Sequence, residues 1–266
     1  MKRKLIFGSF LLFVSLISKA ADDFFYGGIP KAKANLDITI VTNRPYVVGY
    51  DENRRDPLWA AYKLKKVDKL KKLDRPEIPY AMDDQTRSKV PTGGYFGNPK
   101  EPKIGNSVWV HGHMAANDAL GEIYGRDAQV ATFKMSNMCP QSTRLNSGKW
   151  KTLEQKEVKY SQSFGDMWVI CGPIFSEQIV PPLNHDVVVP NKYYKILLRK
   201  KNDKPQVMAI IFDYFPPVGN ANEYLKEHLV SVRTVEKVTG LDFFSSLPKA
   251  TEDALETNSL KDIWQP

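Results

Sequence analysis

The pattern that most restricts the fold of this chain is a set of short runs rich in β-branched and aromatic residues, joined by polar turns. The turn segments DENRRD and KNDKP each separate two such runs. Strands joined by turns this short pair as antiparallel hairpins. We therefore expect one hairpin of strands at 46–50 and 57–64, a second strand pair at 192–200 and 206–215, and a further strand at 36–42.

Helical spacing of apolar residues occurs elsewhere. It predicts one helix over residues 150–164 and another over 222–240, which ends at a glycine, a common helix stop. A buried strand is expected at 166–175 and a further strand at 129–137, followed by a loop at 139–148. Because strands and helices do not alternate regularly, the sequence predicts an α+β fold rather than a doubly wound parallel sheet.

The first 20 residues are typical of a secretory signal peptide. Three basic residues precede an apolar run from Leu5 to Ile17, which is shorter than the roughly 20 residues that a membrane span needs. Ser18 and Ala20 place small residues at the two positions that a signal peptidase recognises, so we expect cleavage after Ala20. The alternative is an uncleaved N-terminal anchor. Residues 21–266 are expected to form a single secreted or periplasmic domain without a membrane span.

The composition adds two constraints. With 38 Lys and Arg against 30 Asp and Glu, the formal charge is +8, which favours polyanionic partners without identifying nucleic acid. The only cysteines are Cys139 and Cys171, and they lack the C-x-x-C spacing of a metal or redox site. In an oxidising compartment they can form a bridge or remain two buried thiols, and the sequence favours neither.

The segment VHGHMAAND at 110–118 holds two of the four histidines. We expect the side chains of His111 and His113 to diverge, so that a shared zinc ion would require a turn at Gly112. With no cysteine or third histidine nearby, the segment lacks the ligands of a usual zinc site. A histidine that accepts a proton beside an oxygen-ligated Mg²⁺ fits better, because Mg²⁺ takes one or two protein oxygens and keeps several waters.

Asn146 and Glu154 can supply such oxygens. Asn146 just precedes the helix expected at 150–164, and Glu154 lies eight residues further on, about two helical turns, so both can face one side. The alternatives are that Asn146 only caps the helix and that Glu154 is a solvated helix charge.

Four short motifs follow one another in the centre of the chain: GHMA at 112–115, ATFKMSNMCPQ at 131–141, LN at 145–146 and WKTLE at 150–154. In this order they resemble the DNA/RNA non-specific endonucleases of the Serratia nuclease and endonuclease G type, which carry a DRGH-type histidine motif, an SNxxPQ segment, then an asparagine and a helical glutamate. Outside this stretch, RPEIPYAMDD, VICGPIF, VVVPNKYYKILL and VEKVTGLDFFSSLP resemble further family segments, so that the resemblance extends from Tyr46 to Pro248.

The resemblance implies an α+β fold in which a central antiparallel sheet is flanked by helices and carries a ββα-metal catalytic core. It implies a single endonuclease domain that hydrolyses phosphodiester bonds of DNA and RNA to 5′-phosphate products. The implied cofactor is Mg²⁺, with Mn²⁺ as the alternative ion. The implied partners are DNA and RNA, and a homodimer stays open.

Individual roles follow from the matching positions. His113 matches the general base, Asn146 the direct metal ligand and Glu154 the residue that holds the waters of the metal. Asn137 matches the asparagine of SNxxPQ, which supports the metal and the histidine. Arg75 matches an upstream arginine that contacts phosphate, for which a guanidinium is suited.

The family pattern DRGHxAP reads VHGHMAA here, with Val110 for the aspartate, His111 for the arginine and Ala116 for the proline. The change removes a carboxylate that would orient the base and a fixed positive charge for phosphate. His111 is expected to be either a substituted phosphate contact or a neutral space-filler. The chain is accordingly either an active nuclease, which the retention of His113 and its partners favours, or a catalytically impaired nucleic-acid-binding member.

Overall fold

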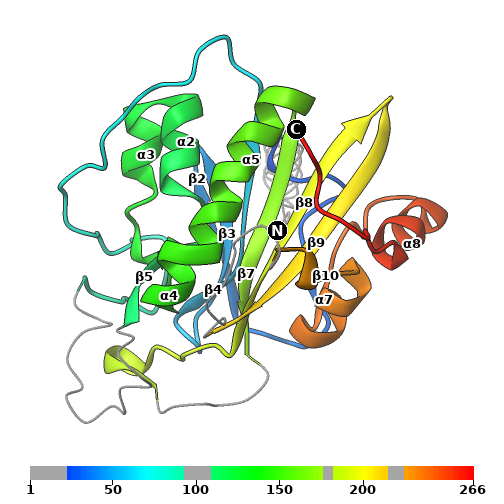
Figure 1. Ribbon diagram of the computed structural model, residues 1–266. Helices are drawn as coiled ribbons and strands as arrows, with labels where there is room; N and C mark the ends of the chain where they lie inside the picture. The colour runs from blue at the N-terminus through cyan, green and yellow to red at the C-terminus, as the bar shows by residue number, and fades with distance from the viewer. Residues whose placement is uncertain (1–22, 93–108, 176–181, 215–224) are drawn as a thin grey trace, which may run out of the picture.

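The computed structural model describes residues 23–92, 109–175, 182–214 and 225–266 (Figure 1). The expected signal peptide at 1–20 and its cleavage site therefore lie outside the described residues. Within the described ranges, the helices are all too short or too polar to cross a membrane.

A seven-stranded sheet forms the centre of the fold, in the order β10-β9-β8-β7-β4-β3-β2. Each neighbouring pair in it is antiparallel. The hairpins expected from the short turns are confirmed, and so is the strand expected at 166–175. The strands are β2 (Ile38–Asn43), β3 (Tyr46–Asp51), β4 (Asp56–Leu64), β7 (Met167–Ile174), β8 (Lys192–Lys201), β9 (Lys204–Asp213) and β10 (Leu229–Val230).

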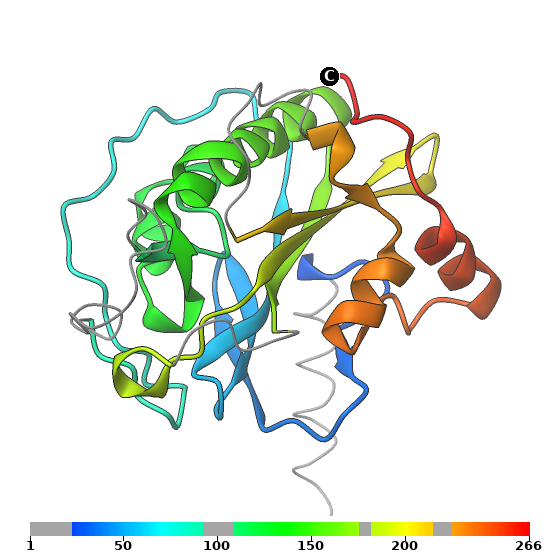
Figure 2. The same cartoon turned by 60° about the horizontal axis from the view of Figure 1, so that its bottom comes forward.

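Helices cover both faces of this sheet (Figures 1 and 2). On one face, α2 (Asn117–Tyr124) and α5 (Lys151–Phe164) pack into a core with the sheet, and α3 (Arg126–Ala131) lies beside α2. On the other face, α7 (Val232–Thr239) and α8 (Lys249–Thr257) close a second core. A small sheet of β1 (Lys31–Ala32) and β11 (Leu241–Asp242) joins the N-terminal segment to this second side. The predicted α+β class is confirmed.

The prediction of a strand at 129–137 is wrong. Helix α3 and the 3₁₀ turn η1 (Met135–Asn137) occupy this stretch. This stretch is hydrogen-bonded to α2: the Asn117 side-chain amide donates to the backbone oxygen of Gln129 at 3.0 Å and to the hydroxyl of Thr132 at 2.8 Å. Contact with α2 therefore outweighs the strand-like alternation of the sequence.

The prediction of a loop at 139–148 is also wrong. The chain forms strand β6 (Met138–Ser142), the short helix α4 (Thr143–Leu145) and the π-helical turn η2 (Asn146–Trp150), which leads directly into α5. Proline is tolerated in β6 because, among the described strands, β6 pairs with β5 alone and is an edge strand. The hydroxyl of Ser142 then accepts a hydrogen bond from the backbone nitrogen of Leu145 and starts the helix.

The helix expected at 222–240 is divided in its described part. Strand β10 interrupts it, and α7 begins only after Ser231, whose hydroxyl accepts from the backbone nitrogen of Thr234 at 3.1 Å. The pairing of β10 with the edge of β9 outweighs the helical spacing of this stretch. Gly240 ends α7 at φ +69°, the left-handed conformation expected of a glycine stop.

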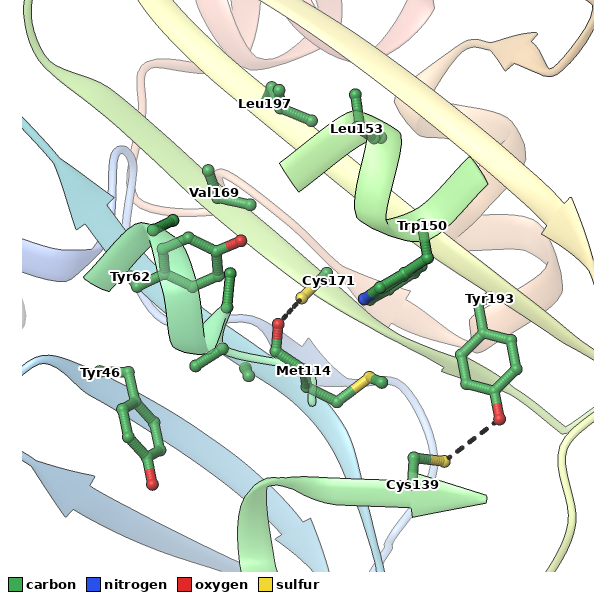
Figure 3. Packing of buried hydrophobic residues seen from close by; sticks show 14 of the residues in the cluster. Tyr46, Tyr62, Met114, Cys139, Trp150, Leu153, Val169, Cys171, Tyr193 and Leu197 are labelled. Atoms are coloured by element: carbon green, nitrogen blue, oxygen red, sulfur yellow. Dashed lines mark hydrogen bonds between the residues drawn. The ribbon is translucent and has the colours of Figure 1, made fainter. Parts of the chain in front are cut away.

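Both cysteines are buried free thiols in the first core (Figure 3). The Cys171 thiol donates to the backbone oxygen of Met114 at 3.0 Å, and the Cys139 sulfur lies 3.7 Å from the hydroxyl of Tyr193. Of the two alternatives, the structure has two buried thiols.

A buried ion pair joins α5 to the sheet. The Lys195 ammonium on β8 lies 2.8 Å from Glu157 on α5, and neither side chain is exposed. The hydroxyl of Tyr62 on β4 donates to the other Glu157 oxygen at 2.6 Å. Burial alone lowers the pKa of Lys195, but the carboxylates of Glu157 and Glu154 raise it above its usual value, so the ammonium stays charged.

We predict that Lys195→Met lowers the free energy of unfolding by about 3–5 kcal/mol, because it leaves the Glu157 carboxylate buried without its cation. The matched control is Lys192→Met on the same strand, whose pair with Asp213 is half-exposed and should contribute little. Urea unfolding of both variants tests this prediction. Equal stability of the two would contradict it.

Candidate active site

The site is built on a β–β–α unit. Strand β5 (Trp109–His113) pairs antiparallel with β6, and the chain continues through α4 and η2 into α5. In this register His113 lies opposite Met138, next to the η1 turn. The ββα core that the sequence resemblance implied is therefore present beside the central sheet.

Both histidines of the VHGH segment lie on one face of β5. Side chains alternate along a strand, so residues two apart point the same way, and our expectation that they diverge was wrong. The ring of Tyr80 contacts both, with centroid distances of 4.3 Å to His111 and 5.9 Å to His113. Gly112 faces the other side, where a Cβ atom would lie 2.3 Å from Gln141 Oε1. The close approach of Gln141 explains the glycine between the histidines.

A hollow of about 180 Å³ collects all the predicted site residues except Asn137. The sequence analysis missed four other lining residues. Two of them could have been suspected, because Asn117 and Asp118 close the same VHGHMAAND segment. The full lining is Arg75, His111, His113, Asn117, Asp118, Asn146, Ser147, Lys151 and Glu154.

Asn137 lies behind the hollow, fully buried in the η1 turn. Its amide oxygen accepts from the backbone nitrogen of Ala115 at 2.8 Å, and its amide nitrogen donates to the backbone oxygens of Ala115 and Thr132, both at 3.1 Å. The backbone nitrogen of Met114 donates to the Asn137 carbonyl at 3.0 Å. Asn137 thus fixes the backbone immediately after His113.

The His113 ring is 7% exposed, and its Nε2 atom is buried without a hydrogen bond to the described residues. Its backbone oxygen accepts from Trp150 Nε1 at 3.1 Å, which ties β5 to the start of α5. Burial, together with the nearby Arg75 and His111, lowers the pKa of His113 to about 3. The ring is therefore neutral at pH 7 and offers a nitrogen lone pair.

Glu154 and Asn146 bring oxygen ligands to the same hollow. Asn146 does not cap α5; it stands in the π-helical turn η2, whose Gly148 departs from helical geometry. Such turns often occur at functional sites, because they re-aim one side chain within a helix. Glu154 lies in the first turn of α5, so the shared face expected from the sequence is present.

The Glu154 carboxylate fits a bound cation. Its Oε1 atom is buried, accepts no hydrogen bond from the described residues and lies 3.6 Å from the Lys195 ammonium. Burial raises the pKa of Glu154 to about 7 even though Lys195 opposes this. A cation in the hollow would give this oxygen a closer partner. The lining offers amide and carboxylate oxygens but no thiolate, a donor set that suits Mg²⁺ or Mn²⁺.

Arg75 enters the hollow from the segment between β4 and β5. Its guanidinium donates to the hydroxyl of Tyr80 at 3.0 Å and lies 5.2 Å from the ring centroid of Phe133. Tyr80 stacks on His111 and on Phe133, with interplanar angles of 25° in both cases. Burial lowers the pKa of His111 to about 4, opposed by a hydrogen bond with the Thr92 backbone, so that this ring is neutral at pH 7.

A second group of carboxylates lies among the C-terminal elements on the other side of the sheet. Ligand atoms of Glu236, Asp242 and Glu256 lie within 4.8 Å of one another. Arg233 already supplies a positive charge there, 2.8 Å from Glu256 and 3.9 Å from Glu236. The ion pairs of Arg233 with Glu236 and Glu256 link α7 to α8.

Comparison with known proteins gives consistent matches. A profile of the DNA/RNA non-specific endonucleases matches residues 28–250. The mitochondrial nuclease EXOG of Danio rerio is 30% identical over 235 residues, covering 84% of this chain and 64% of the relative. Human mitochondrial endonuclease G is 26% identical over 215 residues, covering 76% of this chain and 68% of the relative. The chain spans less than two thirds of the EXOG relatives that it matches.

The fold also matches a solved structure. A crystal structure of the EndoG/EndoGI complex superposes with a TM-score of 0.67 at 21% identity, covering 88% of this chain and 94% of the other. The two chains therefore share a fold, including the ββα unit beside an antiparallel sheet.

Proposed function

We propose that this chain, which belongs to the DNA/RNA non-specific endonuclease family, is a metal-dependent endonuclease that hydrolyses phosphodiester bonds of DNA and RNA. One observation carries the proposal: an imidazole, two oxygen ligands and a guanidinium converge on one hollow from separate segments. Hydrolysis of a phosphodiester needs a base, a cation and a phosphate contact within reach of one another. The hollow supplies a residue for each of these roles.

In this proposal His113 is the general base that takes a proton from the attacking water. Its neutral ring allows this, as does its Nε2 atom, which has no hydrogen bond to any residue that the structure describes. Without a nearby negative charge, the low pKa of His113 makes it a weak base. A phosphate placed there would raise that pKa, because a negative charge favours the imidazolium form. Asn137 holds the backbone that follows the base.

The proposed cofactor is Mg²⁺, with Mn²⁺ as the alternative. Asn146 would bind it through its amide oxygen, and Glu154 would hold its waters. When bound, the cation would supply positive charge to the phosphate and to the leaving oxygen. Arg75 would contact the phosphate directly, and we expect products with 5′ phosphates.

The substrate would be held through its backbone. Arg75 and Lys151 are the cations in the lining of the hollow, and both suit phosphate oxygens. Binding through such contacts weakens steeply as salt rises and carries little sequence preference. We therefore propose that DNA and RNA are both substrates.

A specific observation favours a second candidate, a nucleic-acid-binding member that has lost catalysis. Val110 stands where the family carries an aspartate, and within the described part of the chain no carboxylate hydrogen-bonds to the His113 ring. An unoriented imidazole accepts protons less efficiently. The retained base and oxygen ligands favour the active enzyme.

We predict that His113→Ala lowers cleavage of plasmid DNA and of total RNA by about 10²–10⁴-fold, the usual contribution of a general base. The control is His185→Asn, an exposed histidine at φ +61°, a conformation that asparagine tolerates. Melting curves should show that both variants fold. Wild-type activity in His113→Ala would refute the proposal, whereas DNA binding without cleavage by the wild type would support the second candidate.

We predict that EDTA abolishes cleavage and that Asn146→Ala raises the Mg²⁺ concentration for half-maximal activity by about 10–100-fold. The cause is the loss of a direct ligand. Asn35→Ala, on an exposed residue away from the hollow, should keep the wild-type requirement. The Mg²⁺-induced rise in melting temperature should also shrink in Asn146→Ala. An unchanged Mg²⁺ dependence would place the ion elsewhere.

We also propose that the chain is exported and that residues 1–20 are removed. The basic and apolar N-terminal segment supports this, although the EXOG relatives are named mitochondrial. After expression in a bacterial host, the mature protein outside the cytoplasm should begin at Ala21 in N-terminal sequencing. Recovery of the protein in the membrane fraction with Met1 retained would instead indicate an anchor.

A further inference from the structure

We propose that Tyr80 and His111 are positioning residues that hold the Arg75 guanidinium at the hollow, where it contacts a phosphate of the bound strand. This inference rests on the proposed function, because it assigns the means by which a substrate contact of that site is held. Neither Tyr80 nor His111 needs to touch the substrate for this role.

The first step is the contact between Arg75 and Tyr80. Arg75 is exposed and belongs to a segment without helix or strand, so its long side chain would otherwise sample many rotamers. The Arg75 Nη2 atom donates to the Tyr80 hydroxyl at 3.0 Å. The guanidinium carbon of Arg75 lies 5.2 Å from the centroid of the Phe133 ring. These two contacts restrict the direction of the guanidinium.

The second step is the placement of Tyr80. Its ring stacks on His111 with a centroid distance of 4.3 Å, and on Phe133 at 5.3 Å. The backbone oxygen of Tyr80 accepts from the Thr92 hydroxyl at 2.6 Å, and the His111 ring has a hydrogen bond with the Thr92 backbone. His111 therefore holds the ring of Tyr80 by stacking and engages the residue that bonds the Tyr80 backbone.

The third step explains the histidine at position 111. A buried neutral imidazole contributes no fixed charge to a phosphate, but it offers a flat ring that stacks on a tyrosine. The strand places this ring on the same face as His113, so Tyr80 and Arg75 are brought to the base by the strand that carries it. From the sequence, His111 is predicted to be either a phosphate contact or a neutral space-filler. In this proposal its role is instead to position Tyr80.

The test compares Tyr80→Phe, Arg75→Gln and the double variant with the wild type. Tyr80→Phe removes only the hydroxyl that accepts from Arg75 and keeps the stacked ring. We expect it to lower kcat/KM by on the order of tenfold, the size of a lost hydrogen bond to a charged group. The double variant should lose no more than Arg75→Gln alone, because both changes remove one contact. Tyr124→Phe is the control, since its hydroxyl bonds the Lys63 backbone away from the hollow.

A second readout separates positioning from general stability. In EDTA, the anisotropy of a fluorescein-labelled DNA duplex gives Kd across a salt series. Arg75→Gln should reduce the slope of log Kd against log salt by about 0.9, as expected for one lost phosphate contact. Tyr80→Phe should reduce the slope in the same direction, while Tyr124→Phe leaves it unchanged. His111→Ala should act like Tyr80→Phe, and His111→Phe, which keeps a stacking ring, should restore most of the loss.

The inference is overturned if Tyr80→Phe equals Tyr124→Phe in both readouts, or if the losses of the single variants multiply in the double variant. The failure of the proposed function looks different. In that case the wild type cleaves neither DNA nor RNA with Mg²⁺, and the binding series alone still decides whether Tyr80 and His111 act through Arg75.

Discussion

The buried contact between Lys195 and Glu157 fixes α5, the helix that carries Glu154, against the central sheet. It joins the middle of α5 to β8, and Tyr62 extends the contact to β4. Sliding α5 along the sheet would leave these desolvated charges buried and unpaired, which is costly. The same ammonium lies 3.6 Å from Glu154, one turn earlier on α5. The Lys195 ammonium that anchors α5 therefore also acts on the carboxylate of Glu154 in the hollow.

The site inherits its rigidity from backbone contacts made on three sides. The side chain of Asn137 hydrogen-bonds the backbone that follows His113, and Trp150 Nε1 donates to the His113 backbone oxygen. The side chain of Gln141 packs against Gly112. None of these contacts uses the groups that would meet a substrate. Functional side chains held in this way keep their geometry without reorganisation, which is the condition under which electrostatic stabilisation is effective. Arg75 is the exception, because it comes from an irregular segment and depends on side-chain contacts.

Much of this arrangement could be predicted from the sequence, and the rest could not, for physical reasons. Alternation and short turns identified the hairpins because strand period and turn chemistry are local. The order of the motifs identified His113, Asn146 and Glu154 as members of one hollow. The β6–α4–η2 stretch was missed because its proline, serine and asparagine are turn formers locally, and only pairing with β5 makes a strand of it. Sequence alone predicts that a lysine such as Lys195 is exposed to solvent, because its partner Glu157 is 38 residues away along the chain. The role of Tyr80 carries no sequence signal, because it arises from stacking between separate segments.

The two thiols have a consequence for how the chain matures. Cys139 and Cys171 finish unbridged in the core, and burial raises the pKa of Cys171 to about 12, so the reactive thiolate is scarce once the protein has folded. The native packing therefore requires no disulfide between them. The export proposed above would expose these cysteines to oxidation before folding, and a bridge formed then would have to be reduced before the core could close. Burial of both thiols on folding would protect them from such oxidation.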